Sequence, residues 1–264
     1  MYDAFSSDYD RFVNWSTRLS AEMPFIERRL RSLGAVKVLD AACGTGMHVI
    51  ALALRGYQTA GADLSGGMVE QAQRNSRLSG VKARFEVAGF GELEKTFSLP
   101  EKSTGKVKIP FDALFCLGNS LPHLLTIDEL QAALLDFARC LRPGGLLLLQ
   151  NRNFDAIVSN QDRWMEPQHH REGENEWLFL RFYDFKPDGL IDFNIMTLKK
   201  EGEATWRQQV STTQLRPLLQ SELTTVLKKT GFSDIACYGD MAGSLYHPKT
   251  SGNLVISARR NEQL

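Results

Sequence analysis

Short β-rich runs alternate with segments of helical pattern through the first half of this chain. The runs are VKVLDA, YQTAGAD, KARFEVA, FDALFCLG and LLLLQN, at positions 36–41, 57–63, 82–88, 111–118 and 146–151. Apolar residues recur at helical spacing in the intervals 47–55, 67–78 and 127–141, and Arg142 to Gly145 end the last helix. This alternation predicts a doubly wound, mostly parallel α/β sheet with helices on both faces. In such sheets, ligands bind in the crevice at the carboxyl ends of the strands.

Beyond residue 152 the pattern changes to strands joined by turns. The predicted strands lie at 177–185, 190–200 and 205–213, with turns at 186–189 and 201–202. They are typical of an antiparallel meander, and their alternation of apolar and polar residues indicates one buried and one solvated face. We interpret the meander as a lid over a neighbouring cleft. A helix at 218–229 and a hairpin-like pair of strands, 232–238 and 253–260, then complete a sheet of seven strands.

The chain has no internal repeat, low-complexity tract or long Gly/Ser/Pro linker, so we expect a single domain spanning 1–264. A chain of this size buries a substantial core. The expected parts are an N-terminal helical cap at 1–34, a ligand-binding core at 35–155, the antiparallel lid at 156–216 and the C-terminal completion of the sheet at 217–264.

Charge and composition argue against two classes of partner. The 31 Lys and Arg residues balance 31 Asp and Glu residues, so no net field would attract nucleic acid or an anionic membrane. No run approaches the roughly 20 apolar residues that span a bilayer, and the N-terminus is acidic and aromatic where a signal peptide would be basic and then apolar. We therefore expect a cytoplasmic protein without a nucleic-acid or membrane partner.

The cysteines and histidines give no sign of a metal centre. The four cysteines lie far apart, with no CxxC pair: Cys43, Cys116, Cys140 and Cys237. Reduced thiols are expected. Adjacent His169 and His170 stand in EPQHHREGENE, whose polar composition predicts a solvated loop.

A glycine-bearing loop joins the first strand to the first helix. In Asp40-Ala-Ala-Cys-Gly-Thr-Gly46, the two glycines remove side chains that would keep a ligand from the backbone. Asp63 ends the second strand, where an acidic residue accepts hydrogen bonds from ribose hydroxyls. The loop lacks both the third glycine that accompanies pyrophosphate binding and the triphosphate motif G-x-x-x-x-G-K-[ST]. A nucleoside without phosphates fits this loop best.

Four motifs in order carry a family resemblance: DAACGTG, GADLSGGM, FDALFCLGNS and CLRPGGLLLL. With them the chain resembles the class I S-adenosylmethionine-dependent methyltransferases, which have a Rossmann-like fold. Within that superfamily, LGNSLPHL at 117–124 and NRNFDAIV at 151–158 resemble glycine and sarcosine N-methyltransferases. The resemblance implies S-adenosyl-L-methionine as methyl donor and S-adenosyl-L-homocysteine as product.

The resemblance also implies the donor-binding residues. Ala42, Gly44 and Gly46 would line the methionine and ribose portion, Asp63 would hold the ribose, and Met68 would touch adenine. Leu117 and Asn119 would flank the methyl group. The other residues implied around the donor are Asp40, Cys43, Leu64, Gly89, Phe90 and His123.

One departure from the family pattern concerns adenine. The family often has an acidic or amide residue after the third strand, near the adenine amine, where this chain has Ala88-Gly89-Phe90-Gly91. The backbone N–H of Phe90 and the side chain of Glu92 are candidate substitutes.

Candidate acceptor-binding residues follow the fourth and fifth strands. Arg152 falls at the carboxyl end of the fifth strand, and in the glycine-methylating family the matching arginine grips a carboxylate. A structural ion pair with a lid carboxylate is the alternative for Arg152. Asn119 would either orient an amine of the acceptor or serve only as a turn-forming residue. His123 would either accept a proton or be a packed residue hydrogen-bonded to the backbone. Aromatic candidates for closing the cleft are Tyr2, Tyr9, Trp15, Tyr183 and Tyr246, because ring faces favour a sulfonium and hydroxyls orient an amine.

The implied reaction is in-line displacement, in which a neutral amine of glycine, sarcosine or a similar amino acid attacks the sulfonium-bound methyl. Asn119, Arg152 and Tyr183 would position the acceptor, and a dedicated base is optional. Alternatives are a methyltransferase for another small metabolite, a nucleic-acid methyltransferase, a nicotinamide-dependent oxidoreductase and a non-catalytic nucleoside-binding module. A homo-oligomer is compatible with all of them.

Overall fold

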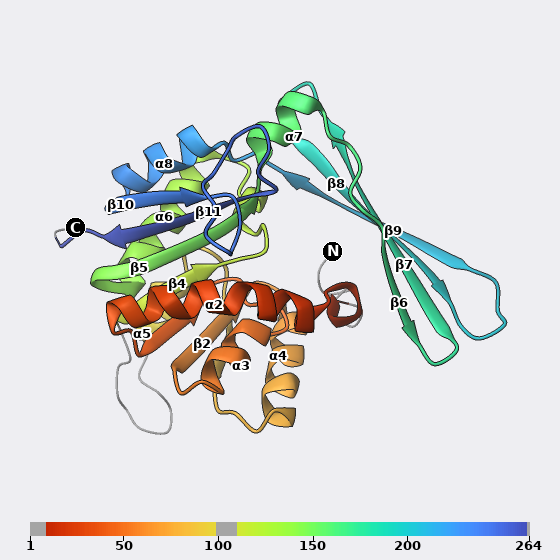
Figure 1. The fold of residues 1–264 in the computed structure, drawn as a ribbon, viewed down its shortest axis with the longest axis horizontal. Coiled ribbons are helices and arrows are strands. Elements are labelled where there is room, and N and C mark those ends of the chain that lie inside the picture. The colour runs from red at the N-terminus through yellow and green to blue at the C-terminus, as the bar shows by residue number, and fades with distance from the viewer. Residues whose placement is uncertain (1–8, 99–109, 263–264) are drawn as a thin grey trace.

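The computed structural model describes residues 9–98 and 110–262 and contains two sheets (Figure 1). The first has seven strands in the order β10-β11-β5-β4-β1-β2-β3. Its strands are β1 (Lys37–Asp40), β2 (Gln58–Asp63), β3 (Arg84–Val87), β4 (Phe111–Cys116), β5 (Leu141–Arg152), β10 (Phe232–Tyr238) and β11 (Asn253–Arg260). Strands β1 to β5 pair in parallel, whereas β11 pairs antiparallel with β5 and β10. The mostly parallel seven-stranded sheet is therefore confirmed.

Helices cover both faces of this sheet. They are α2 (Trp15–Leu33), α3 (Met47–Ala53), α4 (Gly66–Leu78), α5 (Leu93–Ser98), α6 (Ile127–Cys140) and α8 (Gln220–Lys229), with a 3₁₀ turn η1 at Leu121–His123. A further short helix, α7 (Phe154–Asn160), packs instead against residues of the second sheet. Alternate residues of β5 face opposite ways: Leu146 and Leu148 join the core under α2 and α3, and Leu147 and Leu149 join the core under α6 and α8. Burial on both faces explains why β5 is a continuous apolar run.

Strand β5 and two short helices differ from the prediction in the part of the chain before the second sheet. Strand β5 begins at Leu141, opposite Phe111 on β4, so the RPGG segment that was expected to end α6 lies inside the strand, where its register with β4 shifts. The short helices α5 and α7 have no counterpart in the prediction. Their few apolar residues give too brief a pattern to stand out, and burial of Phe97 and Phe154 stabilises them only in the folded chain.

The second sheet is antiparallel and extends away from the core, with strand order β6-β7-β8-β9 (Figure 1). Its strands are β6 (Gln168–Glu172), β7 (Asn175–Phe185), β8 (Ile191–Lys200) and β9 (Arg207–Leu215). Three of them match the predicted meander. The prediction of a solvated loop around His169 and His170 was wrong, because these residues form the edge strand β6 on β7. An edge strand with polar, exposed side chains carries no apolar alternation that would reveal it.

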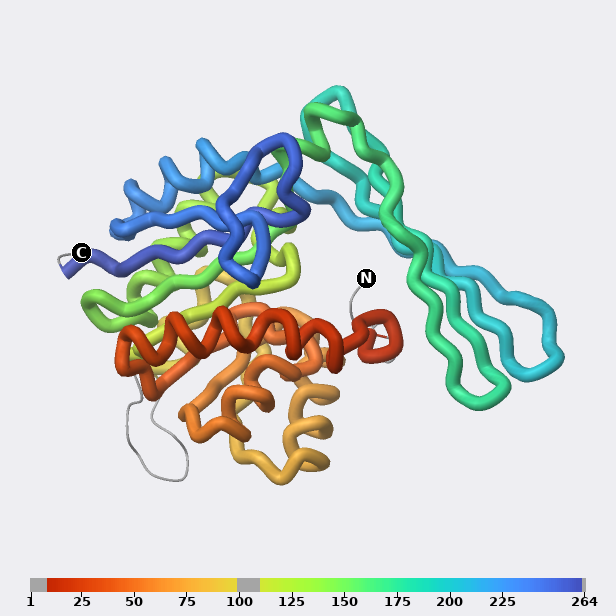
Figure 2. The backbone as a smooth tube through the Cα atoms, in the orientation of Figure 1, coloured from red at the N-terminus to blue at the C-terminus, as the bar shows by residue number. Residues whose placement is uncertain are grey.

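The N-terminal segment closes against both the core and the second sheet. Figure 2 shows the short helical turn at 9–12 between the start of α2 and the antiparallel sheet. Asp10 accepts hydrogen bonds from Thr45 Oγ1 at 2.6 Å and from Trp15 Nε1 at 2.8 Å, which ties this turn to the glycine-bearing loop. Phe12 stacks edge-on against Phe179 of β7, with ring centroids 5.4 Å apart.

Several global features concern only the described residues. None of their helices combines the length and apolarity of a membrane span. They contain no group of three or more His, Cys, Asp or Glu side chains suited to a metal ion. The four cysteines are free thiols, three of them buried.

Candidate functional site

A cavity of about 410 Å³ opens where β1, β2 and β4 end. This is the crevice that the alternating pattern predicted. We call it the donor cavity. Its lining contains Tyr9, Trp15, Arg18, Asp40, Ala42, Cys43, Gly44, His48, Asp63, Leu64, Met68, Gly89, Phe90, Glu92, Leu117, Asn119 and His123, together with Ala41, Ala88, Gly118, Ser120 and Leu124. Every predicted donor residue except Gly46 is among them.

Asp63 is held at the mouth of the glycine-bearing loop by backbone donors. Its Oδ2 accepts the Gly44 N–H at 2.8 Å, and its Oδ1 accepts the Ser65 N–H at 3.0 Å. These bonds connect the first crossover with the second and orient the carboxylate at the end of β2. An oriented carboxylate beside a bare Gly44 backbone fits a ribose with its attached methionine chain.

Gly46 was predicted to line the methionine and ribose portion of the donor, but it is not among the residues that line the donor cavity. Its φ is +80°, and a Cβ there would lie 2.9 Å from the Cβ of Ala72 and 2.9 Å from Cε1 of Phe85. Gly46 faces the protein interior, so it permits close packing of the loop on α4 and β3 and does not line the donor cavity. Gly44, with φ +53°, faces the Tyr9 ring, and a Cβ added there would lie 3.6 Å from Cε1 of Tyr9, an ordinary contact distance.

The side of the cavity expected to receive adenine is organised by a buried carboxylate on α6. Asp136, 3% exposed, accepts the backbone N–H groups of Gly91, Leu93 and Glu94 at 3.0, 2.9 and 2.9 Å. It thereby fixes the loop that contains Phe90, whose ring packs on Phe137. Glu92 Oε2 accepts the Gly89 N–H at 3.1 Å, so this candidate adenine partner is also part of the loop's own hydrogen bonding.

A buried polar cluster underlies the donor cavity. Glu22 of α2 lies 2.6 Å from His48 Nε2, and both of its oxygens lie 3.2 Å from Arg18 Nε. Gln150 of β5 donates to Glu22 at 3.1 Å and accepts from Arg18 at 3.3 Å. Burial alone would raise the pKa of Glu22, but the hydrogen bond with His48 and the charge of Arg18 outweigh it and hold this pKa at about 2. The ionised Glu22 fixes the Arg18 guanidinium at the cavity wall.

A second cavity of about 390 Å³ adjoins the first, and we call it the acceptor cavity. Both cavities are lined by Tyr9, Arg18, Gly118, Asn119 and His123. The lining found only in the acceptor cavity includes Phe12, Glu22, Gln150, Asn151, Arg152, Gln168, Arg181, Tyr183, Phe193 and Ile195. The shared wall allows a group held in one cavity to meet a group held in the other.

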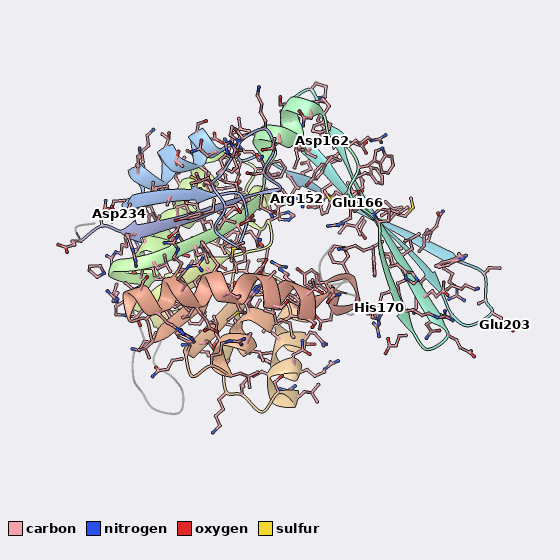
Figure 3. All side chains as sticks on the ribbon, in the orientation of Figure 1. Arg152, Asp162, Glu166, His170, Glu203 and Asp234 are labelled. Carbon is pink, nitrogen blue, oxygen red and sulfur yellow. The ribbon has the colours of Figure 1, made fainter. Side chains whose placement is uncertain are left out.

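Asn119 and Arg152 meet at this shared wall. Asn119 has φ +71° and its side-chain oxygen accepts the Arg152 N–H at 2.9 Å. Asn119 therefore forms the turn after β4 and also lines both cavities, so the two interpretations of this residue coexist. Arg152 forms no side-chain ion pair with any described residue, so the alternative of a structural ion pair with a lid carboxylate finds no partner among them. Figure 3 shows Arg152 at the end of β5, on the side of the seven-stranded sheet that faces the antiparallel sheet.

The aromatic candidates separate into different places. Tyr9 lines both cavities, Trp15 lines only the donor cavity, and Tyr183 lines only the acceptor cavity. Tyr246 lines neither: its hydroxyl lies 2.6 Å from Asn153 and 2.6 Å from Asp155, where it supports α7. Tyr2 lies outside the described residues.

Burial shifts the pKa of three groups that line the two cavities. It lowers the pKa of His123 to about 4, so this imidazole is neutral at neutral pH and is a weak base. It raises the pKa of Tyr183 to about 12, against the opposing charges of Arg152 and Arg181, so the phenol stays protonated. It raises the pKa of Asp40 to about 6, although His48 opposes the shift.

Sequence reasoning missed two arginines at these cavities. Arg18 lies in the N-terminal helical cap, where no ligand-binding residue other than aromatic ones was predicted. Its spacing of four from Glu22 is nevertheless the spacing of a helical ion pair. Arg181 was overlooked inside WLFLRFYDF, where Trp177, Phe179 and Tyr183 share its face of β7. A cation on an otherwise apolar strand face was the available signal.

Comparisons with known proteins agree with this geometry. A family model described as a methyltransferase domain matches residues 38–145. The glycine/sarcosine N-methyltransferase of Aphanothece halophytica is 30% identical over 93% of this chain and 84% of that protein. An S-adenosylmethionine-dependent methyltransferase structure from Clostridium acetobutylicum has a TM-score of 0.75 at 18% identity, covering 98% of this chain and 99% of the other.

A second solved structure shares the fold. It is the S-adenosylmethionine-bound amino pentose methyltransferase of Micromonospora echinaspora, with a TM-score of 0.69 at 21% identity over 97% of this chain and 95% of the other. The donor cavity described here offers a bare glycine backbone, an oriented carboxylate and apolar walls, which fit the same cofactor. These findings also decide against the nicotinamide-dependent oxidoreductase. The chain belongs to the S-adenosylmethionine-dependent methyltransferases, in the family of the glycine/sarcosine N-methyltransferases.

Proposed function

We propose that this enzyme methylates the amine nitrogen of a small amino acid whose carboxylate is held by Arg152. The observation that carries the proposal is Arg152 itself, a guanidinium at the end of β5 on the wall of the acceptor cavity, without a described ion-pair partner. A planar guanidinium suits a carboxylate. The names of the related glycine/sarcosine N-methyltransferases support the same acceptor class, with glycine and sarcosine as first candidates.

S-adenosylmethionine, when bound, would supply a methyl on a sulfonium, which the neutral amine would displace with the S–C electron pair going to sulfur, and the product nitrogen would then release its proton to water. This chain's residues would hold the reactants. Asp63 would accept the ribose hydroxyls. Arg18 would bind the methionine carboxylate, because it is the only Lys or Arg among the described residues lining the donor cavity.

Positioning, not strong base catalysis, is the task of the remaining polar groups. The side-chain oxygen of Asn119 accepts one hydrogen bond, from the Arg152 N–H. A second lone pair on this oxygen and the two amide hydrogens of Asn119 remain for the acceptor. The protonated hydroxyl of Tyr183 can donate to or accept from the amine. With the pKa of His123 near 4, the acceptor nitrogen has to enter as the neutral amine.

The cap and the antiparallel sheet would exclude water from the reacting groups. Besides the Phe12 contact with Phe179, Arg11 pairs with Glu172 of β6 at 2.9 Å and lies 4.8 Å from the Trp177 ring. These contacts join the cap to β6 and β7 beside the acceptor cavity. A closed, oriented site favours direct displacement.

The test is transfer of labelled methyl to a panel of amino acids, other small amines and phenols, with donor binding measured separately by calorimetry. Arg152→Lys is expected to raise the acceptor KM by about 10- to 100-fold, because a single ammonium replaces a two-pronged contact. Donor affinity should change little. The matched control is Arg163→Lys, since Arg163 is an exposed arginine in the segment between α7 and β6, paired with Asp184 of β7. Equal losses of donor and acceptor binding in Arg152→Lys would refute the assignment.

Other outcomes separate the alternatives. Methyl transfer to phenols or to non-amino-acid amines alone would favour another small metabolite as acceptor. Donor binding without any turnover would favour a non-catalytic module. A cytoplasmic location, the absence of a nucleic-acid partner and a homo-oligomer stay predictions.

A further inference from the structure

The acceptor cavity holds more positive charge than one carboxylate requires. Three arginines line it, Arg18, Arg152 and Arg181, and the only described acid in the lining is Glu22. Glu22 already bonds Arg18, His48 and Gln150. The positive charges of Arg152 and Arg181 therefore have no described carboxylate to offset them.

Arg181 occupies an unusual position for a cation. On β7 it lies between Phe179 and Tyr183 on the strand face that points to the cavity, and its cross-strand neighbour on β8 is Ile195. Phe179, Tyr183 and Ile195 are 0%, 2% and 4% exposed. The alternation of β7 thus places a guanidinium where an apolar side chain would normally stand.

The protein satisfies this guanidinium only in part. One contact is the ring of Phe12, 4.9 Å from the guanidinium carbon, which attracts a cation through its face. Arg181 Nε is buried and has no hydrogen-bond acceptor among the described residues. Burial, and then the positive charge of Arg152, lowers the pKa of the Arg181 guanidinium, although an arginine stays charged at neutral pH.

Two further buried polar atoms on the lining lack partners among the described residues. They are Nδ2 of Asn151, a donor, and Oε1 of Gln168, an acceptor. With Arg181 Nε, they come from three strands, β5, β6 and β7. Buried polar groups are ordinarily bonded, so these three atoms mark a part of the cavity wall whose polar groups the protein leaves unsatisfied.

We infer that the preferred acceptor is an amino acid with a second anionic group, which Arg181 holds while Arg152 holds the α-carboxylate. This inference rests on the proposed function and narrows its substrate class. The second group is a carboxylate or a phosphate, since both accept from a guanidinium. Glycine and sarcosine carry only one acid group and would leave Arg181 unpaired in the complex.

The experiment compares kcat/KM for glycine, sarcosine, L-alanine, L-aspartate, L-glutamate and O-phospho-L-serine in the wild-type enzyme, Arg181→Met and Arg181→Lys. The wild type is expected to prefer a dianionic acceptor over glycine by at least about tenfold, and Arg181→Met to lower kcat/KM for that acceptor about a hundredfold. The glycine value should change less than about threefold. Arg181→Lys, which keeps the charge, should lie between. Preference for a dicarboxylic acid or for phosphoserine identifies the second group.

Arg163→Met is the matched control, because Arg163 also lies over two aromatic rings, those of Trp164 and of Phe182 on β7, but lines neither cavity. Calorimetric binding of each acceptor to the enzyme with S-adenosylhomocysteine gives a readout that does not depend on turnover. Thermal unfolding checks that each variant is folded. Should Arg181→Met not fold, Arg181→Lys and the wild-type preference still decide the question.

The experiment distinguishes a failure of this inference from a failure of the proposed function. If the wild type prefers glycine or sarcosine, or if Arg181→Met lowers glycine and dianionic acceptors equally, the inference is wrong and the proposed function stands. If the wild type binds the donor but methylates no amino acid, the proposed function and the inference both fail.

Discussion

Gly46→Ala tests whether the glycine-bearing loop is built for packing at this position. The φ of +80° is unfavourable for alanine, and the added methyl would lie 2.9 Å from atoms of Ala72 and Phe85. Both neighbours are buried, so neither can move into solvent. Because a real Cβ essentially never approaches this closely, the loop, α4 or β3 has to shift.

The expected magnitude has two parts. A left-handed alanine costs about 1–2 kcal/mol, and forcing a methyl into a packed core costs about 1–3 kcal/mol. Gly46→Ala should therefore lower the free energy of unfolding by about 2–5 kcal/mol, which for a chain of this size lowers Tm by about 4–9 °C.

Gly56→Ala isolates the backbone part. Gly56 has φ +89°, and no atom lies within 4 Å of an added Cβ, so its loss should be about 1–2 kcal/mol. Differential scanning calorimetry of the two variants, with and without S-adenosylhomocysteine, measures the difference. If Gly46→Ala unfolds at the same temperature as Gly56→Ala, the close approach at Gly46 is refuted.

Three further predictions concern charged groups. Because burial raises the pKa of Asp40 to about 6, its carboxylate loses charge as pH falls through that value; affinity for the cationic donor should weaken below about pH 6, and Asp40→Asn should remove this dependence in calorimetric titrations. Asp136→Ala should leave three backbone N–H groups in 91–94 unpaired and reduce stability by about 2–5 kcal/mol in urea unfolding; an effect below about 1 kcal/mol would contradict this. The pKa of Glu22 near 2 lies below its usual 4.5, so the stability that Glu22 contributes is present above pH 4.5 and lost as pH falls toward 2. Glu22→Gln should flatten that acid loss, and an unchanged stability-versus-pH curve would count against the cluster.

Local patterns were sufficient where each strand is flanked by turns and buried on both faces. The apolar runs of β1, β4 and β5 identify central parallel strands, and the loop from Asp40 to Gly46 marks the ligand-binding end of the sheet. Short-range spacing contains this information because both side-chain periodicity and turn geometry act over a few residues. Edge strand β6 and the short helices α5 and α7 were not predicted. Their side chains show no strong periodicity, and their stability comes from packing and pairing with other parts of the folded chain.

The site shows the same division. By itself the sequence determined the fold class, the methyl donor through its family motifs, and most residues around the donor cavity, because these follow strands whose order the motifs reveal. Only the tertiary structure decided that Gly46 faces Ala72 and Phe85 and that Arg18 reaches Gln150. It also decided that Arg181 joins Arg152 at one cavity. These contacts join segments far apart in the chain, and their distances depend on how the cap and the antiparallel sheet pack on the core, which no local pattern records.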